Sequence, residues 1–218
     1  MQEFLQGHIN LVKALRDSDL SFHYADLVLI ICAVLSACAS RRWPREKKGI
    51  DRRRFIELLV KHSPDDFHTS WVSVPSLLND GFIDETQTPY GKPGNGARIY
   101  CDDEIDLSLE DAINKYPQVP LKNLKQHCYA YLIYERLRCG YSHEYWHHES
   151  ITHVPASSEG SCVSYIGRTS LSDNTIRRMI SFYLDYLIRL AEYHVSILPS
   201  SCSAHPSCWW IDEKYCCC

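Results

Sequence analysis

Two motifs that could carry chemistry share one histidine, His143. Read forward from it, residues 143–147 are His-Glu-Tyr-Trp-His, the H-E-x-x-H pattern of zinc proteases. Read backward from the same residue, Arg138 and His143 form an R-x4-H pattern, in which an arginine is followed at fixed spacing by a histidine. The first pattern requires a zinc ion, whereas the second pairs a permanent cation with a group that exchanges protons near neutral pH. The two interpretations therefore predict different cofactors and substrates.

The zinc pattern extends to a third histidine. Segment 143–153, HEYWHHESITH, follows H-E-x-x-H-x-x-G-x-x-H at every position except one. In this alternative interpretation His143, His147 and His153 would bind zinc, and Glu144 would activate the metal-bound water.

Three features weigh against that zinc site. Ser150 stands where the pattern requires glycine, because the chain must leave the helix in a left-handed conformation that is costly for a residue with a Cβ. Proteases of this kind also place a methionine in a tight turn beneath the zinc, but the methionines here are Met1 and Met179, and Met179 falls in an expected helix. Upstream of the motif, too few strands are expected for the protease sheet. The arginine pattern is favoured.

The arginine pattern has an informative context. Residues 134–145, YERLRCGYSHEY, resemble the motif region of the HEPN superfamily, small helical proteins with R-x4–6-H near the end of a helix. Many of its stand-alone prokaryotic members are ribonucleases, and an R-C-G-x-x-H-E-Y version is typical of one branch. The order of expected elements over roughly residues 15–198 is also similar. This chain departs from many members at Cys139, where they place a polar residue after the arginine.

The resemblance implies an all-α fold, an antiparallel helical bundle of the HEPN type with a short β-hairpin-like insertion before the last long helix. It also implies a homodimer in which the motifs of both chains converge on one cleft. On one ideal helix, Arg138 and His143 would point about 140° apart, whereas Arg136 and His143 would fall within about 20° of each other. Gly140 can kink the segment and change this geometry. Arg138 is taken as the motif arginine, with Arg136 as its rival or as a phosphate-binding neighbour.

These residue types suit cleavage of RNA, which carries its own nucleophile in the 2′-OH. His143 would act as base or acid on the 2′-OH or the leaving 5′-oxygen, and Arg138 would hold the scissile phosphate. The products would be a 2′,3′-cyclic phosphate and a 5′-OH, and no cofactor is expected. Aromatic neighbours could stack on unpaired bases or pack a dimer. The expected substrate-binding residues are Arg136, Tyr141, Ser142, Glu144 and Tyr145.

The expected function is therefore a metal-independent endoribonuclease, as a toxin or phage-defence effector, with RNA and a second copy of the chain as partners. Some members of the resembled superfamily are instead interaction domains or toxins controlled by an antitoxin. A non-catalytic binding or regulatory module, with an antitoxin or another regulatory partner, is thus the alternative. The zinc protease remains the less favoured one.

Composition indicates a globular chain of 218 residues that is 45% hydrophobic. We expect one helical domain over residues 1–200 and a loosely packed cysteine-rich tail over residues 201–218, in which Cys202, His205 and Cys208 offer an alternative zinc site. The start lacks the features of a signal peptide, so a cytoplasmic protein with mostly reduced cysteines is expected. The apolar run 25–39 is too short for a membrane span and predicts a buried helix.

Charge is distributed unevenly along the chain. The net charge is −4, but residues 41–54, RRWPREKKGIDRRR, carry eight basic and two acidic residues. This basic segment is +6 and the remainder is −10, so it can attract a polyanion locally. A solvated loop followed by a helix start would show the same pattern.

Periodicity and capping residues predict the remaining elements. Helices are expected over 18–39, over 52–62 with Asp51 as the cap, from Pro75 to Asp80, around 107–116, over 121–139 and from Ser172 or Asp173 to Leu198, with a loop over 83–106 and a short hairpin within 150–170.

Overall fold

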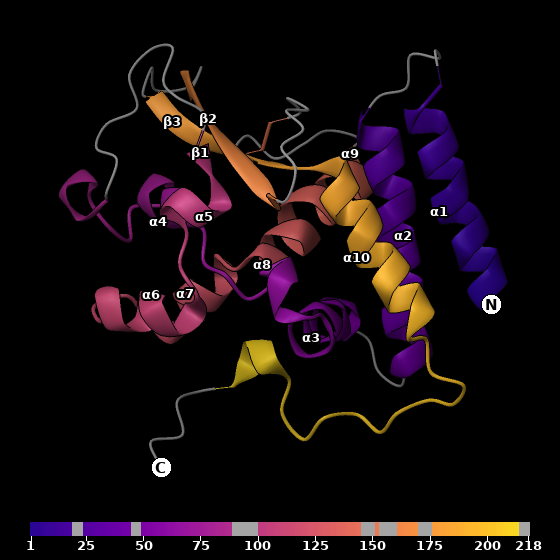
Figure 1. Ribbon diagram of the computed structural model, residues 1–218. Helices are drawn as coiled ribbons and strands as arrows, with labels where there is room; N and C mark the ends of the chain where they lie inside the picture. Colours follow the sequence, from indigo (N-terminus) through magenta and orange to yellow (C-terminus); the bar gives the residue numbers. More distant parts are fainter. Residues whose placement is uncertain are drawn as a thin grey trace.

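The computed structural model describes residues 1–18, 24–44, 49–88, 100–144, 151–152, 161–169 and 176–213. These residues form a mainly helical protein with one small antiparallel sheet (Figure 1). Its strands are β1 (Tyr100–Cys101), β2 (Val163–Thr169) and β3 (Ile176–Phe182), in the order β1-β2-β3. The expected mainly helical class is confirmed, while the HEPN type of bundle stays a prediction.

Three helices lie side by side at one end of the molecule (Figure 1): α1 (Gln2–Arg16), α2 (Tyr24–Arg42) and α10 (Leu184–Ser196). The apolar α2 is long and apolar enough to cross a membrane, but half of that apolar stretch is buried inside the protein. Helix α1 was not expected from the sequence, although its buried Leu5, Ile9 and Val12 recur at the i, i+4, i+7 spacing of one helix face.

Short polar and turn residues place the next elements close to where they were expected. Helix α3 (Asp51–His62) begins one residue earlier than expected and buries Phe55, Ile56, Leu58 and Leu59. Ser73 caps α4 (Val74–Asn79), and Gly81 ends that turn with a φ of +75°, which a residue with a Cβ rarely adopts. The other short elements are η1 (Asp65–Phe67), η2 (Glu85–Gln87), α5 (Asp102–Ile105), α6 (Leu109–Lys115) and η4 (Trp210–Asp212).

The single helix expected over 121–139 is wrong. The chain forms α7 (Leu121–Gln126), α8 (Tyr129–Leu132), the π-helix η3 (Ile133–Cys139) and α9 (Gly140–Glu144). Cys128 is extended and bridges to Val72, and the Tyr129 amide donates to the Trp71 carbonyl at 3.0 Å. Backbone partners more than 50 residues away thus interrupt a segment whose local pattern is helical.

The prediction of a final helix that begins at Ser172 or Asp173 is also wrong for the first part of that helix. Residues 176–182 form β3, which pairs with β2 from Val163 opposite Phe182 to Thr169 opposite Ile176. Within this strand, Arg178, Ile180 and Phe182 are buried at the two-residue period that is typical of a strand. The hairpin expected before the last helix is therefore present, but it extends to residue 182 and α10 is correspondingly shorter.

A buried carboxylate joins the sheet to the helices. Asp106 accepts hydrogen bonds from the Val74 amide at 3.0 Å, from the Tyr165 hydroxyl at 2.6 Å and from the Tyr129 hydroxyl. These donors belong to α4, β2 and α8, and all three residues are buried. The network fixes the sheet against the segment that leads into η3.

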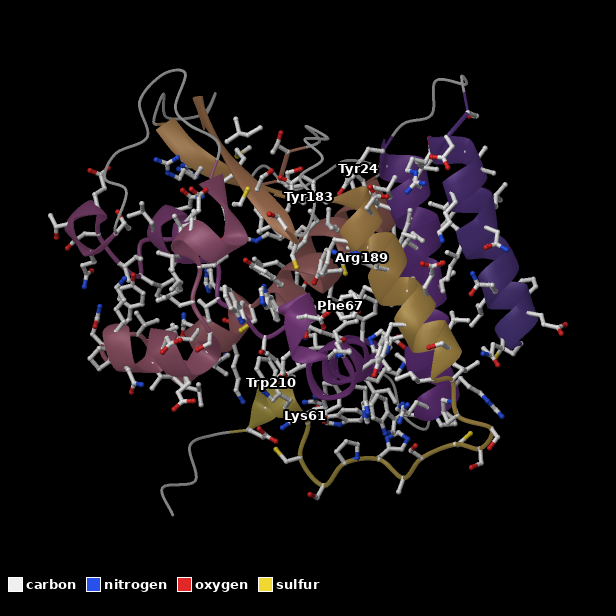
Figure 2. The ribbon with its side chains drawn as sticks, viewed as in Figure 1. Tyr24, Lys61, Phe67, Tyr183, Arg189 and Trp210 are labelled. Carbon is white, nitrogen blue, oxygen red and sulfur yellow. The ribbon has the colours of Figure 1, made fainter. Side chains whose placement is uncertain are left out.

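The described part of the tail, residues 201–213, contacts the helices at several points, and Trp210 is buried there. The Ser203 amide donates to the Arg42 carbonyl at 2.7 Å, and the Trp210 amide donates to a Glu57 carboxylate oxygen at 2.6 Å. Lys125 lies 4.6 Å from the Trp210 ring and donates to its carbonyl. Figure 2 shows Trp210 in the turn that brings the tail back to the body of the protein.

His194 is a titratable group in the helical core. It is 1% exposed on α10, and its Nε2 lies 2.9 Å from the Ser63 hydroxyl oxygen. Burial lowers its pKa to about 3, and the nearby His62 and Arg42 lower it further. The folded protein therefore holds this imidazole neutral at pH values where an unfolded chain would protonate it.

Replacing His194 is expected to change how stability depends on pH. Because the pKa of His194 is lower in the folded state, its contribution to stability is complete above the unfolded pKa of about 6.5 and is lost as the pH falls toward 3. His194→Gln should flatten that part of the decline in unfolding free energy, measured by urea denaturation between pH 7 and 4. The control His8→Gln, on the surface helix α1, should decline like the natural protein, and an equally steep decline in His194→Gln would contradict the assignment.

Candidate functional site

The motif residues lie on two consecutive helical segments. Arg138 is the last but one residue of η3, and His143 lies on α9, which follows without a break. Ser142 and His143 are exposed. Among the described residues, no hydrogen bond joins Arg138 to His143. One chain thus carries both groups near each other along the helix, but does not connect them.

The guanidinium of Arg138 contacts an aromatic ring and a sulfur atom. It lies 5.1 Å from the centre of the Tyr134 ring, and its Nη1 lies 3.7 Å from the sulfur of Cys139. In the part of the chain that the structure describes, no carboxylate comes within ion-pair distance of it. Its N–H donors therefore form no ion pair within these residues, and an arginine offers such donors in a planar fork that matches phosphate.

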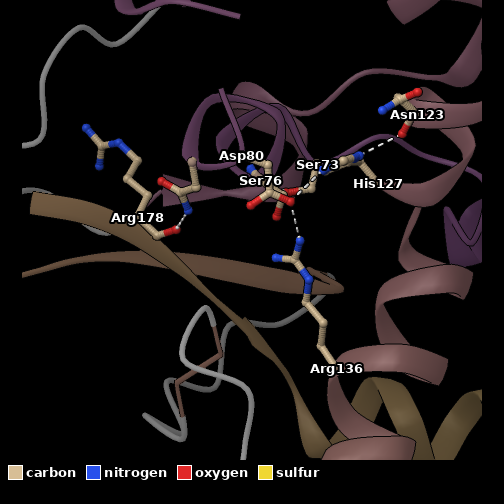
Figure 3. A network of polar contacts seen from close by, with 8 residues as sticks. Ser73, Ser76, Asp80, Asn123, His127, Arg136 and Arg178 are labelled. Carbon is tan, nitrogen blue, oxygen red and sulfur yellow. Dashed lines mark hydrogen bonds and ion pairs between the residues drawn. The ribbon is translucent and has the colours of Figure 1, made fainter. Parts of the chain in front are cut away.

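Arg136 has a different environment. It is 9% exposed and donates from Nη2 to Oδ2 of Asp80 at 2.8 Å (Figure 3). His127 places Nε2 2.9 Å from the same oxygen, while its Nδ1 lies 2.6 Å from the Asn123 carbonyl. Both ring nitrogens of His127 therefore have a polar oxygen within hydrogen-bond distance.

The Asp80 carboxylate thus contacts both Arg136 and His127, and its pKa is lowered even though partial burial opposes this. The hydrogen bond from His127 and the charge of Arg136 are the main causes of the lowering. Arg136 is therefore engaged inside the protein, which gives no support to its expected role at a phosphate. Of the two arginines, the geometry favours Arg138.

The π-helix explains why the angles expected from an ideal α-helix do not apply. Residues 133–139 belong to η3, whose hydrogen bonds run from i to i+5 and whose turn is wider than that of an α-helix. Arg136 therefore reaches Asp80 at the end of α4, whereas Arg138 covers Tyr134, whose ring packs against Phe55 of α3 at 5.3 Å. Single-turn π-helices occur frequently at functional sites.

The other expected site residues differ in their exposure. Tyr141 is only 2% exposed and burial raises its pKa, so its ring has no free face for a base to stack on. Ser142 is exposed, as a residue that donates to phosphate must be. Glu144 ends α9, but its side chain and the whole of Tyr145 lie outside the described residues.

The described residues give no support to either of the two possible zinc sites. His147 and His153 lie outside them, so the triplet His143, His147 and His153 is not tested. No group of three histidine, cysteine or acidic side chains able to hold a metal ion occurs within the described ranges, which include the tail to residue 213. In that tail Cys202 and Cys208 are exposed, and His205 lies 3.1 Å from the Pro44 carbonyl.

The fold also brings part of the basic segment to the motif. Nη1 of Arg52, in the first turn of α3, lies 3.1 Å from Oε1 of Glu135 in η3. The charge run over 41–54 was visible in the sequence, but its position beside η3 was not. The pairing depends on how α3 packs against η3, and residues 45–48 of the run lie outside the described residues.

The candidate site thus consists of an arginine stacked on a tyrosine, an exposed histidine on the following helix and a second arginine from α3. Arg138, His143 and Arg52 supply its charges and its proton-exchanging group. Comparison of the chain with protein-family models, with curated proteins and with solved structures finds no match.

Substitution of the two motif arginines is expected to separate their roles. Arg136→Ala removes a partly buried charged hydrogen bond to Asp80 and should lower the free energy of unfolding by about 2 kcal/mol. Arg138→Ala removes a cation–π contact and a long contact to the Cys139 sulfur, and should lower it by less than about 1 kcal/mol. Urea denaturation at pH 7 measures both changes, and a larger loss in Arg138→Ala would reverse the assignment.

Proposed function

We propose that this chain is a metal-independent endoribonuclease of the HEPN type. The observation that carries the proposal is the Arg138 guanidinium, which stacks on Tyr134 and is paired with no carboxylate among the described residues. His143 is exposed on the helix that follows directly. Together they offer a phosphate-binding cation and a group that exchanges protons near neutral pH.

The proposed reaction is an in-line attack within the RNA strand. His143 takes the proton from the 2′-OH, the 2′-oxygen forms a bond to phosphorus, and the bond from phosphorus to the 5′-oxygen breaks. The leaving oxygen receives a proton from a second histidine, and the products are a 2′,3′-cyclic phosphate and a 5′-OH. Arg138 neutralises the charge that develops on the non-bridging oxygens during this step.

A second copy of the chain would supply the second histidine. In a twofold dimer each surface meets the same surface of the partner, so an interface at α9 would gather two arginines and two histidines. This arrangement is in keeping with an exposed His143 that makes no hydrogen bond to Arg138 within one described chain. It gives the acid and the base of the reaction to different copies of one residue.

Activity is expected in the absence of divalent metal. The purified protein, incubated with total RNA or tRNA in EDTA, should produce fragments that end in a 2′,3′-cyclic phosphate. Arg138→Ala and His143→Ala should each lower the cleavage rate by about 100-fold or more. Arg189→Ala, which removes an exposed arginine on α10 (Figure 2), is the matched control and should retain full activity.

Other outcomes would overturn the proposal in distinct ways. Loss of cleavage in EDTA with recovery on zinc would restore the metal site of the H-E-x-x-H alternative. Binding of RNA without cleavage would favour a regulatory binding module. Full activity of Arg138→Ala would remove this arginine from the site.

A further inference from the structure

Two exposed arginines in the first turn of α3 each hold a carboxylate from a distant segment. Arg52 pairs with Glu135 of η3 at 3.1 Å, and Arg53 pairs with Asp212 of the tail at 2.6 Å. The Arg52 side chain is 49% exposed and that of Glu135 is 32% exposed. Both pairs therefore lie at the protein surface, where solvent and other ions reach them.

The Arg52 pair and Arg138 have Tyr134 as a common neighbour. Glu135 precedes Arg138 by three residues, and Arg136, which lies between them in sequence, contacts Asp80. Tyr134 connects the two arginines, because its ring lies under Arg138 and packs on Phe55 of the same helix as Arg52. Tyr131 and Tyr134 also contribute to a raised pKa of Arg52, after the larger effect of its hydrogen bond to Glu135.

The carboxylate of an exposed ion pair is easily replaced by another anion. Exposed pairs of arginine and carboxylate gain little free energy, because water and salt screen them and two long side chains must be ordered. The two non-bridging oxygens of a phosphodiester can accept paired N–H donors from a guanidinium, as the two oxygens of a carboxylate do. Glu135 and an RNA phosphate would therefore compete for one partner, Arg52.

We propose that Arg52 binds a backbone phosphate of the RNA strand whose scissile phosphate lies at Arg138, and that Glu135 occupies Arg52 until that phosphate displaces it. The inference rests on the proposed function for the identity of the strand. It assigns a role to the basic segment 41–54, which lies outside the resemblance to the HEPN motif. It also gives Glu135 the role of a competing anion that lowers affinity for RNA.

The chain contains a matched control pair. Arg16 at the end of α1 binds Asp185 at the start of α10, and both side chains are at the surface. Glu135→Gln and Asp185→Asn each remove one negative charge and one exposed ion pair without a large change in side-chain volume. A general effect of net charge on RNA binding would therefore be equal in the two variants.

The experiment measures binding of a fluorescein-labelled RNA oligonucleotide by anisotropy, with all variants built on His143→Ala so that the probe stays intact. Glu135→Gln should strengthen binding about threefold or more, and Asp185→Asn should change it much less. Arg52→Ala should weaken binding about tenfold and reduce the steepness of its salt dependence by about one phosphate contact, whereas Arg16→Ala should do neither. Thermal unfolding of each variant checks that the fold is retained.

The outcomes separate this inference from the proposed function. Equal strengthening by Glu135→Gln and Asp185→Asn, or unchanged binding in Arg52→Ala, would overturn the Arg52 site even if the natural protein cleaves RNA. Weakened binding in Arg52→Ala together with strengthened binding in Glu135→Gln would support the site even if the natural protein does not cleave RNA.

Discussion

The ion pair between Arg136 and Asp80 connects η3 to the end of α4. Asp80 follows α4, where Gly81 turns the chain, and it also accepts a hydrogen bond from His127 at the end of α7. One carboxylate therefore connects three segments, and it draws one arginine of η3 inward. Arg138, two residues later, is left to cover Tyr134 on the side of α3. The accessibility of the candidate catalytic arginine depends on the burial of its neighbour.

The sequence was enough to predict the elements whose ends are set by capping and turn residues within the element itself. Helices α3 and α4 lie near their expected positions because Ser63-Pro64 ends the first, and Pro75 and Gly81 mark the second. The interruption at Cys128 could not be predicted, since it arises from hydrogen bonds to residues near position 70. Strand β3 was missed for another reason: Ile176 and Ile180 fit both a helical and an alternating pattern, and pairing with β2 decides between them.

The candidate site was predictable to a similar extent. The spacing of Arg138 and His143 identified two residues that the structure places on consecutive helical segments. Nothing local indicated that Arg136 pairs with Asp80 or that Glu135 binds Arg52, because both partners are more than 50 residues away. The tail shows the same limit, since Trp210 contacts Glu57 and Lys125, which are distant in sequence. Periodicity identifies candidate residues, whereas long-range ion pairs decide which of them are free to bind.

Because η3 is a π-helix, the number of residues between an arginine and a histidine does not by itself determine how the two side chains are oriented. In an α-helix, each residue inserted between two positions rotates the second by about 100° around the axis. A π-helical turn accommodates an additional residue and offsets part of that rotation. Two chains whose motif spacers differ by one residue can therefore present the same pair of side chains in the same relative orientation, provided that their helices differ in type. Helix type is thus as much a component of such a motif as the spacer length by which it is recognised.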